Sequence, residues 1–270
     1  MITASATMKG TLHEEKGIAN QDAVCLVEKA GYSCAILGDG VSLKSDWTFS
    51  NSEIASAIVT RSAAMYLEEM LKTSLDDQQA MDLVRDTFQF AEQMLEESLE
   101  KAGIPFLDCQ TTLIVALFKE GRLYGGIAGD GGILYEQKDG SIGLMVTHLK
   151  TSSSVFPIGD THQWRFFEAG STGQPVIQVL AATDGVFDQL IIPYNGQPVG
   201  NFEEISRLFQ IGSIPENQRH DWLEKQIAAL PGYDDKTIAL LIDPEKRKEQ
   251  DIQNQEGGRY TPESQDADPD

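Results

Sequence analysis

Acidic residues in this sequence recur at the ends of short apolar runs, where a carboxylate can bind a metal ion. Each precedes a glycine or stands at the start of a strand-like run, and there are five of them: Asp22, Asp39, Asp130, Asp184 and Asp234. An Asp-Gly pair at a strand end is also typical of a turn, so one pair alone is a weak indication of a ligand. The set is more informative, because adjacent strands would bring several of these ends to one edge of a sheet.

Carboxylates gathered in this way need a compensating charge. Two of them about 4 Å apart repel each other by about 4 kcal/mol at an effective dielectric constant of about 20, so the cluster must hold cations or share protons. No His or Cys stands beside these positions, and ligands that are all oxygen favour Mg²⁺ or Mn²⁺ over Zn²⁺. The pattern predicts a site for a hard divalent cation.

The overall charge argues against several classes of partner. Asp and Glu total 42 against 21 Lys and Arg, which gives a formal net charge of −21. Such a surface repels nucleic acids and anionic membranes, because binding to them depends on cationic side chains that neutralise phosphates. No apolar run reaches the roughly 18 residues of a membrane span, and the N-terminus lacks the pattern of a signal peptide. We expect a cytoplasmic protein that binds neither nucleic acid nor membrane.

Size and cysteine content are those of an ordinary globular protein. The 270 residues are 41% hydrophobic and 23% charged, and a chain of this length can fold without a disulfide or a metal. The three cysteines include no C-x-x-C pair, which favours a reducing, cytosolic setting. Nothing in the sequence demands more than a monomer.

The first half of the chain predicts a hairpin followed by helices. Two apolar runs, at 22–29 and 32–38, are close enough in sequence for a β-hairpin. Apolar residues at helical spacing then predict two helices, one reaching Met70 and one ending at Gly103.

The second half is richer in strands. We expect strands at 111–118, 122–129, 131–137, 142–149, 176–183 and 236–242, with short helices at 202–210 and 217–229. The first four of these strands would be consecutive and antiparallel, and residues 150–175 would form a loop-rich insertion. Because the helices are grouped rather than alternating with strands, the order indicates an α+β fold with helices packed on antiparallel sheets.

The last segment differs from the rest in composition. Residues 244–270 contain only Ile252 and Tyr260 as large apolar side chains, too few to offset the entropy lost on ordering. We therefore expect a folded domain over residues 1–243 and an acidic, disordered tail over 244–270.

Six short motifs follow one another along the chain: N-Q-D (20–22), G-D-G-V-S (38–42), Q-T-T-L-I-V-A-L (110–117), G-D-G-G (129–132), T-D-G-V-F-D (183–188) and D-D-K-T (234–237). Each is weak alone, but their order over residues 5–243 resembles the metal-dependent Ser/Thr protein phosphatases of type 2C. The G-T-L-H run at 10–13 resembles the opening of a bacterial branch of that family.

The resemblance implies a fold and an activity. The fold is a four-layer αββα sandwich of two antiparallel sheets flanked by helices. The activity is hydrolysis of phosphoserine or phosphothreonine in a phosphorylated protein substrate, by attack of a metal-bridging hydroxide. The cofactors are two Mn²⁺ or Mg²⁺ ions, with a third, weaker ion in bacterial relatives.

The resemblance also implies roles for individual residues. Asp39 would bridge both metals, and the carbonyl oxygen of Gly40 would bind one of them. Asp184 and Asp234 would complete the protein ligands of the first metal. These carboxylates and that of Asp22 form the expected catalytic centre.

Further residues would support that centre. Asp22 would hold a metal-bound water, and Asp130 together with Asp184 would match the third metal. Asp188 and Gln21 would order the site from a second layer through hydrogen bonds.

The sequence departs from the family pattern at three places. Gln21 stands where the family commonly has Glu, which removes one negative charge. Val41 stands where some relatives have a His proposed to protonate the leaving oxygen. The Arg that grips substrate phosphate is absent, and His13 is the favoured substitute over Lys16 and Lys9; the alternative for His13 is a hydrogen-bonded structural role.

These departures leave a second function open, a catalytically inactive, phosphatase-like binding or regulatory module.

The 150–175 segment is equally open to two interpretations, a mobile flap that selects substrates or an ordinary surface loop.

Overall fold

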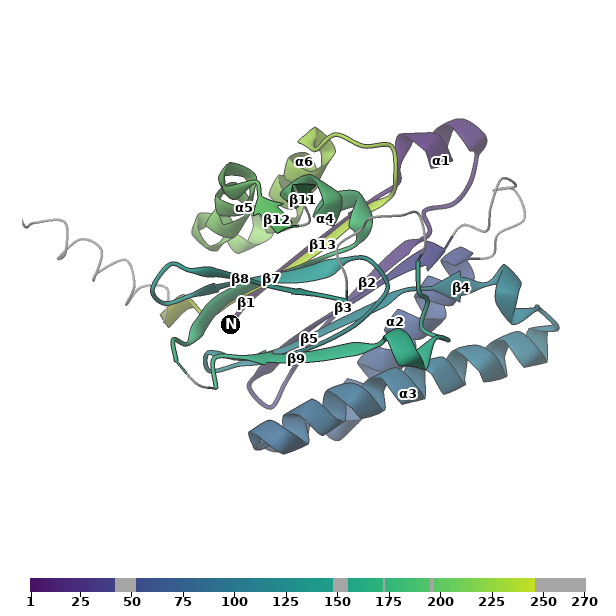
Figure 1. Cartoon of the computed structure of the whole chain (residues 1–270), viewed down its shortest axis with the longest axis horizontal. Helices are drawn as coiled ribbons and strands as arrows, with labels where there is room; N and C mark the ends of the chain where they lie inside the picture. Colours follow the sequence, from purple (N-terminus) through teal and green to yellow (C-terminus); the bar gives the residue numbers. More distant parts are fainter. Residues whose placement is uncertain (42–51, 148–154, 172, 195–196, 246–270) are drawn as a thin grey trace, which may run out of the picture.

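Two antiparallel sheets stacked face to face form the centre of the protein (Figure 1). The computed structural model describes residues 1–41, 52–147, 155–171, 173–194 and 197–245. The first sheet contains, in spatial order, β1 (Ile2–Met8), β13 (Lys236–Ile242), β10 (Val176–Ala182), β7 (Gly132–Gln137) and β8 (Ile142–Val146). The second contains β2 (Asp22–Lys29), β3 (Tyr32–Val41), β5 (Leu113–Lys119), β6 (Arg122–Ala128) and β9 (Arg165–Ala169), with the short β4 (Gln110–Thr111) paired to β3.

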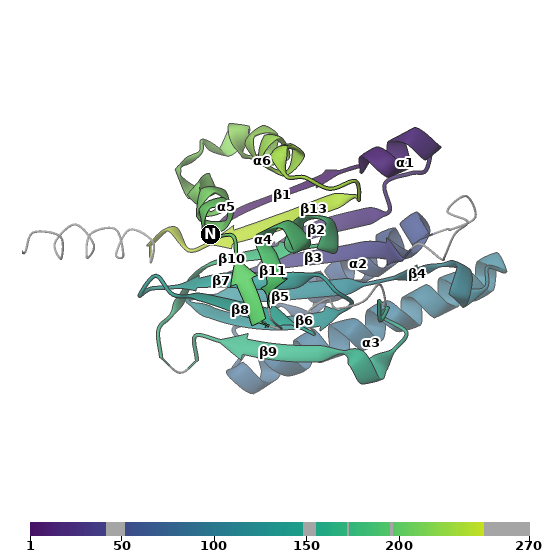
Figure 2. The same cartoon turned by 45° about the horizontal axis from the view of Figure 1, so that its top comes forward.

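Helices cover the outer face of each sheet (Figures 1 and 2). The second sheet is covered by α2 (Ser52–Met70) and α3 (Asp77–Ala102). The first is covered by α4 (Asp184–Leu190), α5 (Phe202–Leu208) and α6 (Arg219–Ala229). The remaining elements of the described residues are α1 (Thr11–Lys16), the hairpin of β11 (Ile191–Tyr194) and β12 (Gln197–Gly200), and short 3₁₀ turns at Phe106–Asp108, Thr161–Gln163, Phe209–Ser213 and Glu216–Gln218.

Three layers of apolar side chains hold these four layers together. In β5, Val115 packs toward α2 and α3, while Ile114 packs between the sheets. In β13, Leu240 packs toward α4, α5 and α6, while Leu241 packs between the sheets. The central strands are therefore apolar on both faces, which explains their unbroken runs of hydrophobic residues. The predicted α+β sandwich is confirmed.

The link from β6 to β7 passes from one sheet to the other. It contains Gly129, Asp130 and Gly131, and Gly129 adopts a φ of +116° that favours glycine. A Cβ atom on Gly131 would lie 2.6 Å from the carbonyl oxygen of Ala182 in β10. The glycines thus allow the chain to cross close to β10, and Asp130 stands where the two sheets meet.

Several predicted boundaries agree with the structure. The strands at 22–29 and 236–242 match β2 and β13. The second helix ends at Gly103 as expected, but it begins earlier, at Asp77. Asp76 and Gln79 form a capping box that starts it, a signal that lies upstream of the apolar spacing.

Two expectations were wrong. Strands 111–118 and 122–129 do pair, but the strand at 131–137 belongs to the other sheet. The four predicted strands from 111 to 149 are therefore not one continuous antiparallel meander. The 150–175 segment contains β9, which pairs with β6 at the edge of the second sheet, where alternating polar residues obscured it. Sequence reasoning assigned no element to β1, α1, α4 or the β11–β12 hairpin.

Other expectations stay predictions. Residues 246–270, most of the predicted tail, and 148–154, part of the 150–175 segment, lie outside the described residues. No helix in the described ranges is both long enough and apolar enough to cross a bilayer.

The packing between the sheets can be tested with two leucines. Leu241→Ala should lower the free energy of unfolding by about 2–5 kcal/mol, because this fully buried side chain would leave a cavity. The matched change Leu107→Ala removes a side chain that is 67% exposed and should alter it by less than about 0.5 kcal/mol. Urea unfolding followed by circular dichroism gives both values, and equal effects would contradict this packing.

Candidate metal centre

Three of the predicted carboxylates meet at one end of the sandwich. Asp39 lies near the end of β3, Asp130 lies in the link between β6 and β7, and Asp184 is the first residue of α4. Each offers one carboxylate oxygen, and these oxygens all lie within 4.8 Å of one another. They come from both sheets, so the packing of the two sheets creates the cluster.

Asp22 and Asp234 lie next to this cluster. Asp22 is the register partner of Asp39 across β2 and β3, and its Oδ2 accepts a hydrogen bond from Oγ1 of Thr183 at 2.8 Å. Asp234 and Asp184 line one hollow, which also contains Asp188 one helical turn farther along α4. The structure therefore brings all five strand-end carboxylates to one region.

Crowding of these carboxylates changes their acidity. Burial, reinforced by Asp184, Asp22, Asp130 and Asp234, raises the pKa of Asp39 well above its usual range. Burial, opposed by Thr237 and Thr183 and reinforced by Asp235 and Asp184, raises the pKa of Asp22 to about 8. Burial and the Asp184 charge raise the pKa of Asp234 to about 6. In each case the surroundings disfavour the charged form, which a bound cation would stabilise.

This donor set fits a hard divalent cation. Its candidate ligand atoms are all carboxylate oxygens, which Mg²⁺ and Mn²⁺ prefer. Oδ1 of Asp22 is buried and has no hydrogen-bond partner within the described part of the chain. Because buried charges are normally paired or bound to metals, Asp39, Asp130 and Asp184 are the residues best placed to hold an ion, with Asp234 and Asp22 beside them.

Two threonines fix the backbone at Asp39. The N–H of Asp39 donates to Oγ1 of Thr112 at 3.0 Å, and Oγ1 of Thr111 donates to the carbonyl oxygen of Asp39 at 2.9 Å. The N–H of Thr112 donates to the same carbonyl at 2.8 Å. The Q-T-T motif thus anchors the end of β3 and limits the positions that the Asp39 carboxylate can take.

Gly40 allows α2 to approach the end of β3. A Cβ atom on Gly40 would lie 2.6 Å from Cβ of Ser52, the first residue of α2. Oγ of Ser52 donates to the carbonyl oxygen of Val41 at 2.6 Å, and the N–H of Gly40 donates to the carbonyl oxygen of Gln21 at 3.0 Å. The proposed role of the Gly40 carbonyl as a metal ligand stays a prediction.

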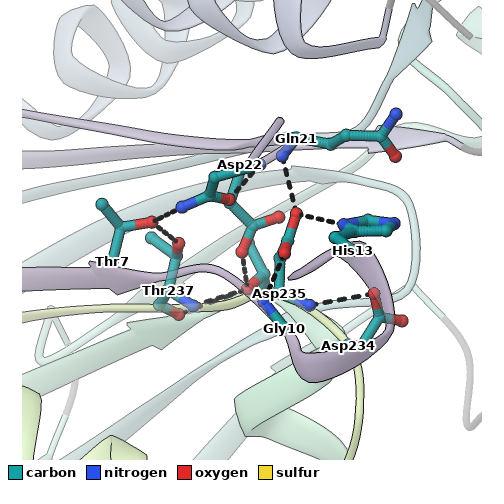
Figure 3. Close-up of polar contacts among 10 residues, drawn as sticks. Thr7, Gly10, His13, Gln21, Asp22, Asp234, Asp235 and Thr237 are labelled. Atoms are coloured by element: carbon teal, nitrogen blue, oxygen red, sulfur yellow. Dashed lines mark hydrogen bonds and ion pairs between the residues drawn. The ribbon is translucent and has the colours of Figure 1, made fainter. Parts of the chain in front are cut away.

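Asp235 is a buried carboxylate beside the cluster to which the sequence analysis assigned no role (Figure 3). Its Oδ1 accepts from the N–H of Gly10 at 2.6 Å, and its Oδ2 accepts from the N–H of Gln21 at 2.6 Å. The same Oδ2 lies 2.8 Å from Nδ1 of His13. Asp235 is 2% exposed and, from its place just before β13, holds the start of α1 and the residue before β2. The D-D-K-T motif contained it, but only its neighbour Asp234 was assigned a role.

The same contact involves two residues singled out in the sequence, His13 and Gln21. His13 is 2% exposed and sits on Asp235, the arrangement expected for a structural histidine. Gln21 is 1% exposed and supplies backbone groups, while Lys9 and Lys16 keep solvent contact. Phosphate binding by His13 stays a prediction.

The chain is similar to known phosphatases in sequence pattern and in fold. The family model for protein phosphatase 2C matches residues 9–228, whereas a sequence search of curated proteins finds no match. A bacterial serine phosphatase superposes with a TM-score of 0.65 at 17% identity, over 89% of this chain and 96% of that one. Stp1 from Staphylococcus aureus superposes with a TM-score of 0.64 at 16% identity, over 89% of this chain and 94% of that one. The catalytic domain of PstP, solved with two manganese ions, superposes with a TM-score of 0.60 at 15% identity, over 88% of this chain and 96% of that one. At these identities the structures establish a shared fold.

The metal-free protein should lose stability as pH rises. An Asp whose pKa is higher in the folded than in the unfolded chain stabilises the fold at low pH, and this contribution disappears as pH rises through the folded pKa. The pKa of Asp22 is about 8 in the folded protein and about 3.9 in the unfolded chain, so this stabilisation is lost between about pH 4 and about pH 8. In the presence of a chelator, the melting temperature should fall by at least about 5 °C over this pH range, because each kcal/mol of lost unfolding free energy lowers it by about 2–4 °C.

Divalent ions supply the control for this measurement. Added Mn²⁺ or Mg²⁺ should raise the melting temperature most at high pH and so remove the decline. A melting temperature in chelator that stays constant or rises with pH would show that the carboxylate cluster does not behave as described.

Asp235 and Asp234 form a matched pair of neighbours. Asp235→Asn should lower the free energy of unfolding by about 2–4 kcal/mol, because an amide NH₂ would face backbone N–H groups that now donate to a carboxylate. Asp234→Asn removes a repelled carboxylate and should leave the metal-free protein at least as stable. Chemical unfolding in chelator compares the two variants, and similar losses would refute the assigned division of roles.

Proposed function

The chain belongs to the protein phosphatase 2C family, and we propose that it is a metal-dependent protein-serine/threonine phosphatase. The observation that carries the proposal is the cluster of Asp39, Asp130 and Asp184, whose oxygens lie within 4.8 Å of one another at the meeting point of the two sheets. An enzyme that had lost its chemistry would have no reason to retain so costly a group of buried like charges.

The proposed cofactors are two Mn²⁺ or Mg²⁺ ions, with a third, weaker ion beside Asp130. The structural relative PstP was solved with two manganese ions, which supports the choice of metal. When bound, the ions would stabilise charge on the phosphoryl oxygens and activate a water molecule as the nucleophile.

The residues of the chain would hold and orient this machinery. Asp39, Asp184 and Asp234 would bind the ions, and Asp39 is positioned for it by the hydrogen bonds from Thr111 and Thr112. Asp22 would orient the attacking water through Oδ1, since its Oδ2 accepts from Thr183. No covalent intermediate on the protein is needed.

The proposed substrate is a phosphorylated protein of the cytosol. Free thiols at Cys25 and Cys34 agree with a reducing compartment. The net charge of −21 argues against a nucleic acid as substrate. No feature of the sequence requires an assembly larger than a monomer.

Activity can be tested with p-nitrophenyl phosphate and phosphoserine peptides in the presence of Mn²⁺. We expect turnover that a chelator abolishes and that Asp184→Asn lowers by at least about 100-fold, because the variant removes one charged ligand from the cluster. Asp82→Asn, a change at an exposed site on α3, is the matched control and should retain full activity.

The assay also separates the alternative function. No turnover by protein that still binds Mn²⁺ in calorimetry would overturn the enzyme and favour an inactive binding module. Reversion of Gln21 and Val41 toward the family residues would then be the next step.

A further inference from the structure

A hollow opens beside the candidate metal centre, on the side of α4. Its lining residues come from α4 and from the loop before β13: Asp184, Gly185, Asp188, Gln189, Gly232, Tyr233 and Asp234. Two of them, Asp184 and Asp234, are proposed metal ligands. A substrate phosphate at the ions would therefore leave its attached peptide next to this hollow.

Tyr233 is the prominent side chain of that loop. It is 65% exposed. The carbonyl oxygen of Tyr233 accepts from the N–H of Leu12 at 3.1 Å, and a Cβ atom on Gly10 would lie 2.4 Å from that oxygen. The backbone is thus fixed against the segment around α1, and the ring is presented to solvent on a rigid support. Pre-positioned aromatic rings of this kind serve as contact surfaces for ligands.

The geometry of α4 sets the distance from the reacting phosphate. Asp188 follows Asp184 by four residues, so both lie on the same helix face about 6 Å apart along the axis. An extended peptide advances about 3.3–3.6 Å per residue. The hollow therefore lies one or two residues from the phosphorylated side chain.

The chemistry of the lining favours a cation. Among the described residues that line the hollow there is no Lys or Arg, and Asp188 adds a carboxylate beyond the proposed metal ligands. The face of a tyrosine ring attracts Lys and Arg side chains, and their apolar stems can pack on it. The whole molecule carries a formal charge of −21, which strengthens the preference for a basic segment.

We propose that this hollow binds a basic side chain one or two residues from the phosphoserine or phosphothreonine of the substrate, and that Tyr233 is its contact surface. The inference rests on the proposed function, because it takes the metal centre as the place of the phosphate. It assigns Tyr233 a role in substrate specificity that is separate from metal binding.

Binding of inert peptides tests this subsite independently of turnover. Two labelled peptides carry a phosphonomethyl analogue of phosphoserine, which cannot be hydrolysed, with either Arg or Ala at the two positions on each side. Fluorescence anisotropy with the Mn²⁺-loaded protein should give about tenfold tighter binding of the Arg peptide. Tyr233→Ala should reduce this ratio to within about threefold, while Tyr233→Phe should preserve it, because the ring and not the hydroxyl makes the contact.

Phe202→Ala supplies the matched control, since it removes another exposed aromatic side chain (61% exposed) from α5 and should leave the ratio unchanged. Equal affinity of the two peptides for the wild-type protein would overturn the proposal. An Arg preference that survives in Tyr233→Ala would also overturn it, because general attraction to an acidic protein would then be the cause.

Turnover of the corresponding phosphoserine peptides distinguishes this inference from the proposed function. Hydrolysis without any Arg preference would refute the subsite and leave the phosphatase standing. An Arg preference that depends on Tyr233, without hydrolysis, would refute the phosphatase and retain the subsite.

Discussion

Repulsion among buried carboxylates is the main physical constraint on this structure. Asp39 lies among four other acidic side chains, and burial together with their charges raises its pKa well above the usual range. A fold does not collect such groups for stability, because each costs free energy when charged and unpaired. The rigid surroundings, from the Thr111 and Thr112 hydrogen bonds to the close packing at Gly40, hold the carboxylates near one another against that repulsion. The scaffold would thus provide fixed carboxylate ligands for a cation, and a bound cation would provide the positive charge that offsets the repulsion between them.

Asp234 and Asp235 are neighbours in the sequence, but their different surroundings suit them to different roles. Asp234 lies at the hollow among other acids, and its pKa is raised to about 6. Asp235, one position later, points into the protein and accepts from two backbone N–H groups and lies within hydrogen-bond distance of His13. Both residues precede β13, in the loop that ends at Lys236, yet their side chains meet different partners. One is suited to a metal and the other to holding α1 and β2 in place.

The sequence predicted the components of the site better than their supports. Asp39, Asp130 and Asp184 could be found because a carboxylate at the end of an apolar run is a local pattern, and the α+β class followed from the order of runs. The role of Asp235 could not be predicted in this way, because its partners lie more than 200 residues away in the chain. Likewise β9 was missed because an edge strand with one solvated face lacks the apolar run that marked the central strands, and the transfer of β7 to the other sheet depends on long-range pairing.

The pairing of β1 with β13 has a consequence for biosynthesis. β1 lies beside β13, which are the first and last strands among the described residues, and β13 also separates β1 from β10 within the sheet (Figure 2). As the ribosome extends the chain, β1 has no partner in this sheet until β13 has emerged, and Asp234 and Asp235 emerge just before it. A nascent or prematurely terminated chain therefore lacks both the strand that joins β1 to β10 and the carboxylates of Asp234 and Asp235. Such long-range pairing slows folding, and this sheet can be completed only after β13 has been synthesised.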